Sequence, residues 1–172
     1  GQFFGEFSVR RPRNAQSLEI KGLELNLVHT LDWLPGVLSG FGVQANATFV
    51  STNRDFDVNQ IGQSFAAEGI GNSQNGTVFY EKYGISARIA YNRRERFLRQ
   101  LAGGSGNEPI FVRDYGQFDG SVAVNVTPAV QVFVEGTNLF NAKYFQTGRF
   151  DNQLLQYQNF GPRYDAGVRF SF

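Results

Sequence analysis

The sequence predicts an all-β protein whose antiparallel strands cross a membrane as part of a β-barrel. Apolar and polar residues alternate along about eight segments, as in strands with one apolar and one wet face. The connections between these segments alternate between long and short, and aromatic residues, which make up 15% of the 172 residues, gather near segment ends. These three observations together are typical of an outer-membrane barrel.

The composition excludes several chemistries. The chain has no Cys, which removes disulfides, thiolate metal sites and cysteine nucleophiles. Its single His, His29, leaves a His-pair metal site without ligands. The net charge of +1 gives no strong field for nucleic acid. We therefore expect no enzymatic activity, no metal, no cofactor and no nucleic-acid partner. No apolar run approaches the ~18–20 residues of a membrane helix, although β-barrels need no such run.

The C-terminal segment shows the alternation most clearly, because apolar residues occupy every second position from Tyr164 to Phe172. The same period predicts strands over residues 3–10, 18–31, 41–49, 74–81, 85–92, 118–126 and 130–135. Phe133 interrupts the polar face of its segment. No segment fits a helical period as well, so we expect no helix.

One segment changes phase. Leu18 and Ile20 occupy even positions, whereas the leucines from Leu23 to Leu27 occupy odd ones. A one-residue shift at Gly22 predicts a β-bulge there. Backbone pairing that runs straight through Gly22 would contradict this prediction.

The connections differ in length between the two ends of the strands. Residues 52–73, 97–114 and 143–159 are long, polar and rich in Gly, Asn and Gln, while 82–84 and 127–129 are tight turns and 32–40 is intermediate. Only the short link at 11–14 breaks the asymmetry. Aromatic residues are expected to form two interfacial girdles, with Trp33 and Phe41 on the short-turn side. On the other side we expect Tyr91, Phe97, Tyr115, Phe140 and Tyr144.

A soluble β-sandwich also has alternating strands, but two features disfavour it. Small residues on the apolar faces, such as Ala45, Ala47 and Gly120, would fill a core poorly. The opposite faces are consistently polar over many strands, which suits an aqueous lumen.

Six short motifs occur in order over residues 14–172: Lys21–Leu25, Leu34–Gly36, Gly42–Asn46, Tyr80–Arg88, Gly136–Asn141 and Tyr164–Phe172. In this order they resemble the C-terminal end of TonB-dependent outer-membrane receptors. The resemblance implies a barrel of about 22 strands, closed by an N-terminal plug, that imports a siderophore, cobalamin or carbohydrate with energy passed on by the TonB system. It also implies the outer membrane of a Gram-negative bacterium. Residues 1–172 would then be the C-terminal part of the barrel domain, with the plug and the TonB-contacting segment absent.

The expected partners follow from this resemblance. They are outer-membrane lipid and lipopolysaccharide, the remainder of the barrel and plug, the TonB system acting through the plug, and the outer-membrane assembly machinery. The terminal pattern of Tyr164, Val168, Phe170 and Phe172 resembles the signal that this machinery recognises. An ordinary lipid-facing last strand explains the same pattern, and the two interpretations are compatible.

The loop 143–159 is the best candidate for a substrate contact. Its side chains Tyr144, Arg149, Gln153 and Tyr157 could stack on and hydrogen-bond a sugar or an aromatic chelate. The alternative is a loop that packs only on its neighbours.

Other polar features have simpler explanations. The arginines from Arg93 to Arg99 could meet lipopolysaccharide or an anionic ligand, but ordinary rim charge is favoured. Asp55 and Asp57 fit a solvated loop, and the Gly-rich stretches 69–76 and 103–106 fit flexible surface loops.

A complete eight-stranded barrel with a structural or adhesive role is the alternative to a receptor segment. Pairing of Phe3–Arg10 with Tyr164–Phe172 would favour this small barrel.

Overall fold

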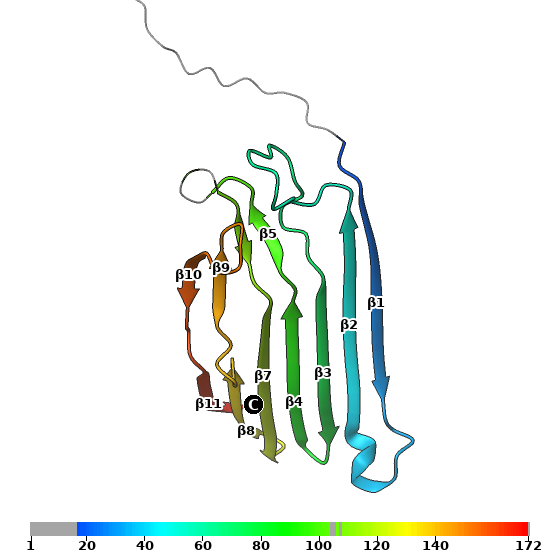
Figure 1. Ribbon diagram of the computed structural model, residues 1–172. Helices are drawn as coiled ribbons and strands as arrows, with labels where there is room; N and C mark the ends of the chain where they lie inside the picture. Colours follow the sequence, from blue (N-terminus) through cyan, green and yellow to red (C-terminus); the bar gives the residue numbers. More distant parts are fainter. Residues whose placement is uncertain (1–16, 104–105, 107, 172) are drawn as a thin grey trace, which may run out of the picture.

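The computed structural model describes residues 17–103, 106 and 108–171. Seven strands form one antiparallel sheet in the order β1-β2-β3-β4-β7-β8-β11 (Figure 1). Their bounds are β1 Ile20–Thr30, β2 Phe41–Thr52, β3 Ser73–Lys82, β4 Ile85–Arg94, β7 Tyr115–Thr127, β8 Val130–Thr137 and β11 Arg163–Phe170. A second antiparallel sheet has the order β10-β9-β6-β5. Its strands are β5 Phe97–Gln100, β6 Ile110–Val112, β9 Tyr144–Thr147 and β10 Leu154–Gln158.

The all-β, antiparallel prediction is confirmed. Each of the seven predicted segments that lie within the described residues is a strand of the large sheet. The predicted strand at 3–10 and the link at 11–14 lie outside the described residues. The connection between β1 and β2 contains a 3-10 helix, η1 (Gly36–Gly40). Among the described residues, no helix is long and apolar enough to span a membrane.

The large sheet has one apolar and one polar face because its register keeps residues of the same kind opposite each other. On the apolar face Ala87 pairs with Val122, and Val122 pairs with Val134. No second layer of described residues covers this face, and Figure 1 shows the seven strands as a single layer. Leu25, Val122 and Val168 each remain about half exposed.

The apolar band crosses the strands obliquely. Leu25 is central in the apolar run of β1, and its cross-strand row passes through β2, β3 and β4 to Gly116 of β7. The apolar run of β7 is instead centred on Val122, six residues beyond Gly116. With ~3.3 Å per residue and ~4.8 Å between strands, this displacement over the four strand pairs corresponds to a strand tilt of roughly 45° from the band normal.

The predicted bulge at Gly22 is wrong. Lys21 pairs with Ser51, Gly22 with Val50 and Leu23 with Phe49, with no shift of register. The apparent phase change arises at the end of the strand. Leu18 precedes β1, and Ile20 is its first residue and half exposed, so no burial forces either of them onto the apolar face.

Two phenylalanines stand on the polar face, each opposite a glycine of the next strand. Phe79 pairs with Gly42, and Phe133 pairs with Gly167. The space above each glycine is filled by the ring of its partner. The Arg169 guanidinium lies 5.4 Å from the centre of the Phe133 ring. An apolar residue therefore occurs at Phe133 on the polar face because its ring covers the backbone of Gly167, which has no side chain.

The connections are long at one end of the large sheet and short at the other. The turns after β3 and β7 and the η1 connection lie at the end opposite the small sheet (Figure 1). At the long end, two of the connections that the sequence predicts as loops contain strands. Residues 97–114 include β5 and β6, and residues 143–159 include β9 and β10. Leu98 and Phe111 explain the difference, because these apolar residues pair across β5 and β6 and are both buried in one hydrophobic cluster.

Within the described strands the large sheet stays open, with β1 and β11 as its two edges. The pairing expected for a small closed barrel involves Phe3–Arg10 and Phe172, which lie outside the described residues.

Candidate functional site

Three connections meet at the long end of the sheet and form the candidate site. They are residues 53–72 between β2 and β3, the described residues of 101–109 between β5 and β6, and 148–153 between β9 and β10. Ala66, Leu98 and Phe111 form a small buried cluster beneath them. The Phe56 ring meets the Phe111 ring edge-on at 5.4 Å between centroids. This cluster fixes the first connection against the small sheet.

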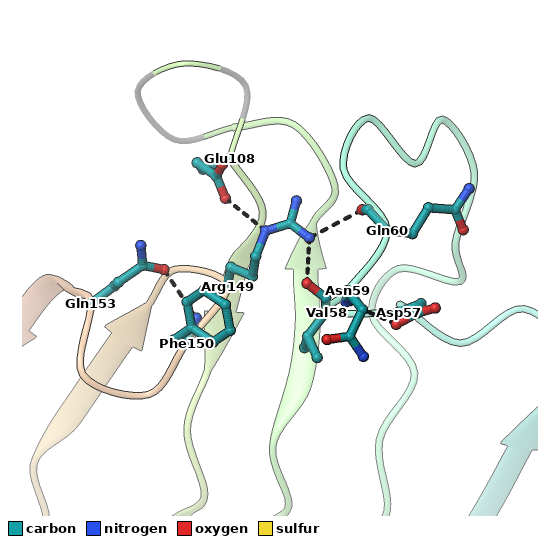
Figure 2. Close-up of polar contacts among 8 residues, drawn as sticks. All are labelled: Asp57, Val58, Asn59, Gln60, Glu108, Arg149, Phe150 and Gln153. Atoms are coloured by element: carbon teal, nitrogen blue, oxygen red, sulfur yellow. Dashed lines mark hydrogen bonds and ion pairs between the residues drawn. The ribbon is translucent and has the colours of Figure 1, made fainter.

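Arg149 joins all three connections (Figure 2). Its Nη1 donates to the carbonyl oxygens of Val58 at 2.8 Å and Gln60 at 3.1 Å. Its Nε lies 3.3 Å from Oε2 of Glu108, and its guanidinium lies 5.1 Å from the centre of the Phe56 ring. The side chain is only 12% exposed. The sequence predicts that Arg149 touches substrate. In this structure its N–H groups instead contact the carbonyl oxygens of Val58 and Gln60 and the Glu108 carboxylate.

Gln153 shapes the turn that presents Arg149. Its Oε1 accepts a hydrogen bond from the backbone N–H of Phe150 at 3.0 Å, and its own carbonyl oxygen accepts one from Gly148 at 2.8 Å. The side chain thus acts within its own connection (Figure 2). Arg149 and Gln153 are the two predicted site residues that the structure brings together.

Tyr144 and Tyr157 lie on neighbouring strands but on opposite faces of the small sheet. Tyr157 pairs with Phe145 across β10 and β9, and their rings lie 5.1 Å apart. Tyr144, the residue next to Phe145, points to the other face, where its hydroxyl accepts a hydrogen bond from Gln146 at 3.0 Å. The four predicted substrate contacts therefore do not converge on one pocket.

The predicted arginine cluster is largely engaged by protein groups. Arg93 forms an ion pair with Asp114 at 3.2 Å, and Arg96 forms one with Asp151 at 3.4 Å. Arg94 donates to the carbonyl oxygen of Gly69 at 2.7 Å and stacks on a phenylalanine ring. Exposed ion pairs of this kind fit a charged rim.

A recess of about 370 Å³ lies between the first connection and β5, and the sequence did not indicate it. Its walls include the rings of Phe56, Phe97 and Phe111. The Glu95 carboxylate also lines it and accepts hydrogen bonds from the amides of Asn72 and Gln74. These residues come from three separate segments, so no local pattern could reveal the recess.

The other site residues that the sequence singles out and the structure describes lie in a turn or on the exposed apolar face of β11. Asp57 accepts a hydrogen bond from the backbone of Asn59, as in a turn. Within the described residues, no group of three or more His, Asp or Glu side chains could hold a metal ion. Tyr164, Val168 and Phe170 lie exposed on the apolar face of β11, and Phe172 lies outside the described residues.

Comparison of this chain with protein families, curated proteins and solved structures gives no match.

Proposed function

We propose that this chain is the C-terminal part of the barrel of a TonB-dependent receptor, which imports a scarce nutrient across the outer membrane of a Gram-negative bacterium. The observation that carries the proposal is the single-layered sheet with one uncovered apolar face. The receptor class rests on the ordered motifs from Lys21 to Phe172. The polar faces would line a lumen and the apolar faces would contact lipid.

The apolar face is too large for a soluble monomer. It extends over seven strands, whereas exposed apolar patches of soluble monomers rarely exceed a few hundred Å². A soluble antiparallel sheet packs that face on a core. Lipid supplies the missing layer without requiring interdigitation, which suits the small residues Ala45 and Ala47.

The geometry of the band supports a bilayer as that layer. The strand tilt of roughly 45° lies at the upper end of the ~35–45° range for outer-membrane barrels. The apolar run of β2 from Phe41 to Phe49, tilted by this amount, covers about 20 Å along the membrane normal, near the ~25 Å apolar band of such barrels. The core of a β-sandwich does not require the apolar residues to form a band of constant height that crosses the strands at this tilt.

The long-connection end would face the cell exterior, because outer-membrane barrels have short periplasmic turns and longer external loops. The nutrient would first meet the connections that Arg149 holds together. Transport would need the plug and the TonB system, which the resemblance implies for the whole receptor.

Cysteine labelling in intact cells tests the orientation and the membrane location. The chain has no Cys, so each introduced thiol is unique within it. In the full-length protein, Gln60→Cys should react with a membrane-impermeant maleimide in intact cells, whereas Pro128→Cys should react only after the outer membrane is permeabilised. Both positions are exposed, so accessibility in the folded protein is matched. Equal labelling of both in intact cells, or recovery of the protein in a soluble fraction, would overturn the proposal.

The genomic reading frame upstream of Gly1 separates the receptor from the small barrel. A plug-encoding stretch there supports the receptor. A signal peptide that directly precedes Gly1 would contradict it.

A further inference from the structure

Five amide side chains form one cross-strand row on the polar face. Asn26 pairs with Asn46, Asn46 with Asn75, Asn75 with Asn92, and Asn92 with Gln117. The row therefore runs through β1, β2, β3, β4 and β7 without a break, over about 19 Å at ~4.8 Å per strand. Its members on β3, β4 and β7 lie two residues from the long-connection end of their strands.

Hydrogen bonds connect the members on β1, β2 and β3, and those on β4 and β7 both donate to Asp119. Asn46 donates through its amide to Oδ1 of Asn26, and Asn75 donates to Oδ1 of Asn46 at 3.4 Å. At the other end, Gln117 donates to Asp119 at 2.6 Å. The hydroxyl of Tyr115 donates to Oε1 of Gln117, also at 2.6 Å, and places an aromatic ring beside the end of the row.

The row keeps unused hydrogen-bonding capacity on an open face. Each amide has two N–H donors and a carbonyl acceptor with two lone pairs. Among the described residues, Asn46, Asn75, Asn92 and Gln117 each donate one side-chain hydrogen bond to the protein. Asn26, Asn75 and Asn92 are exposed. The row thus offers donors and acceptors at every strand and contains no charged side chain.

We propose that this amide row binds a neutral, hydroxyl-rich solute of the oligosaccharide class. The inference rests on the proposed function, which turns the polar face towards a lumen. Sugar hydroxyls both donate and accept, so they match amides that have both capacities left. An anionic chelate would instead require cationic groups. The charged group bonded to the row is the Asp119 carboxylate, and the nearby Arg94 donates to the carbonyl oxygen of Gly69. Among the nutrients that the resemblance implies, the row thus favours a carbohydrate.

Calorimetric titration of the full-length protein with maltohexaose and cellohexaose tests the inference. We expect binding of at least one of these neutral hexasaccharides. The double variant Asn46→Ala/Asn75→Ala removes two amides from the middle of the row. Because a neutral hydrogen bond contributes about two- to tenfold in affinity, the double variant should bind about tenfold more weakly or worse.

Asn125→Ala is the matched control. Asn125 is an exposed amide on the polar face of β7, outside the row, and it accepts a hydrogen bond from Gln131. Its variant should keep the affinity of the parent protein within twofold. Heat-modifiable electrophoretic mobility would verify that each variant is folded.

Three outcomes would overturn the inference. They are no binding of either hexasaccharide, equal weakening by the control, and a double variant that lowers the melting temperature but keeps the affinity. The last outcome would show that the row only ties strands together. A protein that reaches the outer membrane but binds no hexasaccharide refutes this inference alone, whereas a protein absent from that membrane refutes the proposed function.

Discussion

Replacement of Arg149 should loosen the long-connection end without unfolding the large sheet. Arg149→Gln removes the charge, the hydrogen bonds to Val58 and Gln60, and the ion pair with Glu108. Val58 and Gln60 are exposed, so water can hydrogen-bond to their carbonyl oxygens once Arg149 is replaced. We therefore assign about 1 kcal/mol to each of the two hydrogen bonds, less than the ~1.5–3 kcal/mol of a hydrogen bond to a charged group. The ion pair with the partly exposed Glu108 adds at most about 1 kcal/mol, and the contact with the Phe56 ring adds about 0.5–1 kcal/mol. The sum is about 2–4 kcal/mol of local stability.

Hydrogen exchange of the first connection measures this loss. The N–H of Ala67 donates to the carbonyl of Arg54 at 2.8 Å, and the N–H of Gly69 donates to that of Leu98 at 2.7 Å. Both bonds belong to the connection that Arg149 holds. A local loss of about 2–4 kcal/mol should accelerate their exchange about 30- to 1000-fold, while amides of β7 and β8 exchange as before.

Arg113→Met provides the control for loss of a guanidinium at this end. Arg113 is exposed, and its guanidinium lies 5.6 Å from the centre of the Phe145 ring. Its replacement should leave the exchange of Ala67 and Gly69 nearly unchanged. If Arg149→Gln also leaves the exchange of these two amides unchanged, Arg149 does not stabilise the first connection. Its guanidinium would then again be a candidate substrate contact.

Three further predictions concern the large sheet. Val122→Arg should lower the free energy of unfolding in lipid by about 2–4 kcal/mol, while Ser121→Arg on the polar face should cost much less; equal losses would exclude a lipid contact at Val122. A Cβ at Gly42 would overlap the Phe79 ring, so Gly42→Ala should cost about 1–3 kcal/mol in denaturant unfolding, and Phe79→Ala in the same chain should relieve part of that strain; a full additive loss would contradict the pairing. Trp33, the only Trp of the chain and 71% exposed, should be quenched by brominated lipids, measured as the difference from Trp33→Phe; no quenching would remove it from the interfacial girdle.

The large sheet could be predicted because its strands obey a short-range rule. Side chains alternate between faces along each strand, so Leu23, Leu25 and Leu27 share a face whatever the rest of the chain does. The predicted bulge at Gly22 failed at the point where that rule weakens. Ile20 is the first residue of β1, beyond the apolar band, where either face meets water.

The candidate site could not be predicted in the same way, because distant segments build it. Arg149 and its acceptor Val58 are 91 positions apart. The small sheet is equally non-local, since β6 pairs with β9 as well as with its neighbour β5. Isolated strands of three or four residues have no stable alternation to detect, and only the burial of Leu98 and Phe111 makes them strands.

The width of the lumen decides between a receptor segment and a small barrel. An eight-stranded barrel has an interior just wide enough for side chains to fill, so its inward residues must pack on one another. On the polar face of the described strands, charged residues such as Glu24, Glu135 and Asp165 remain exposed, and two glycines are covered only by a phenylalanine of the next strand. In a filled interior those carboxylates would have to pair with the arginines of the same face, such as Arg88 and Arg169, since an unpaired buried charge is strongly unfavourable. A wide lumen imposes no such requirement, and water or a polar solute can reach every amide of the row from Asn26 to Gln117. The proposed receptor therefore predicts that these charges stay solvated, whereas a closed eight-stranded barrel predicts that they are paired in its interior.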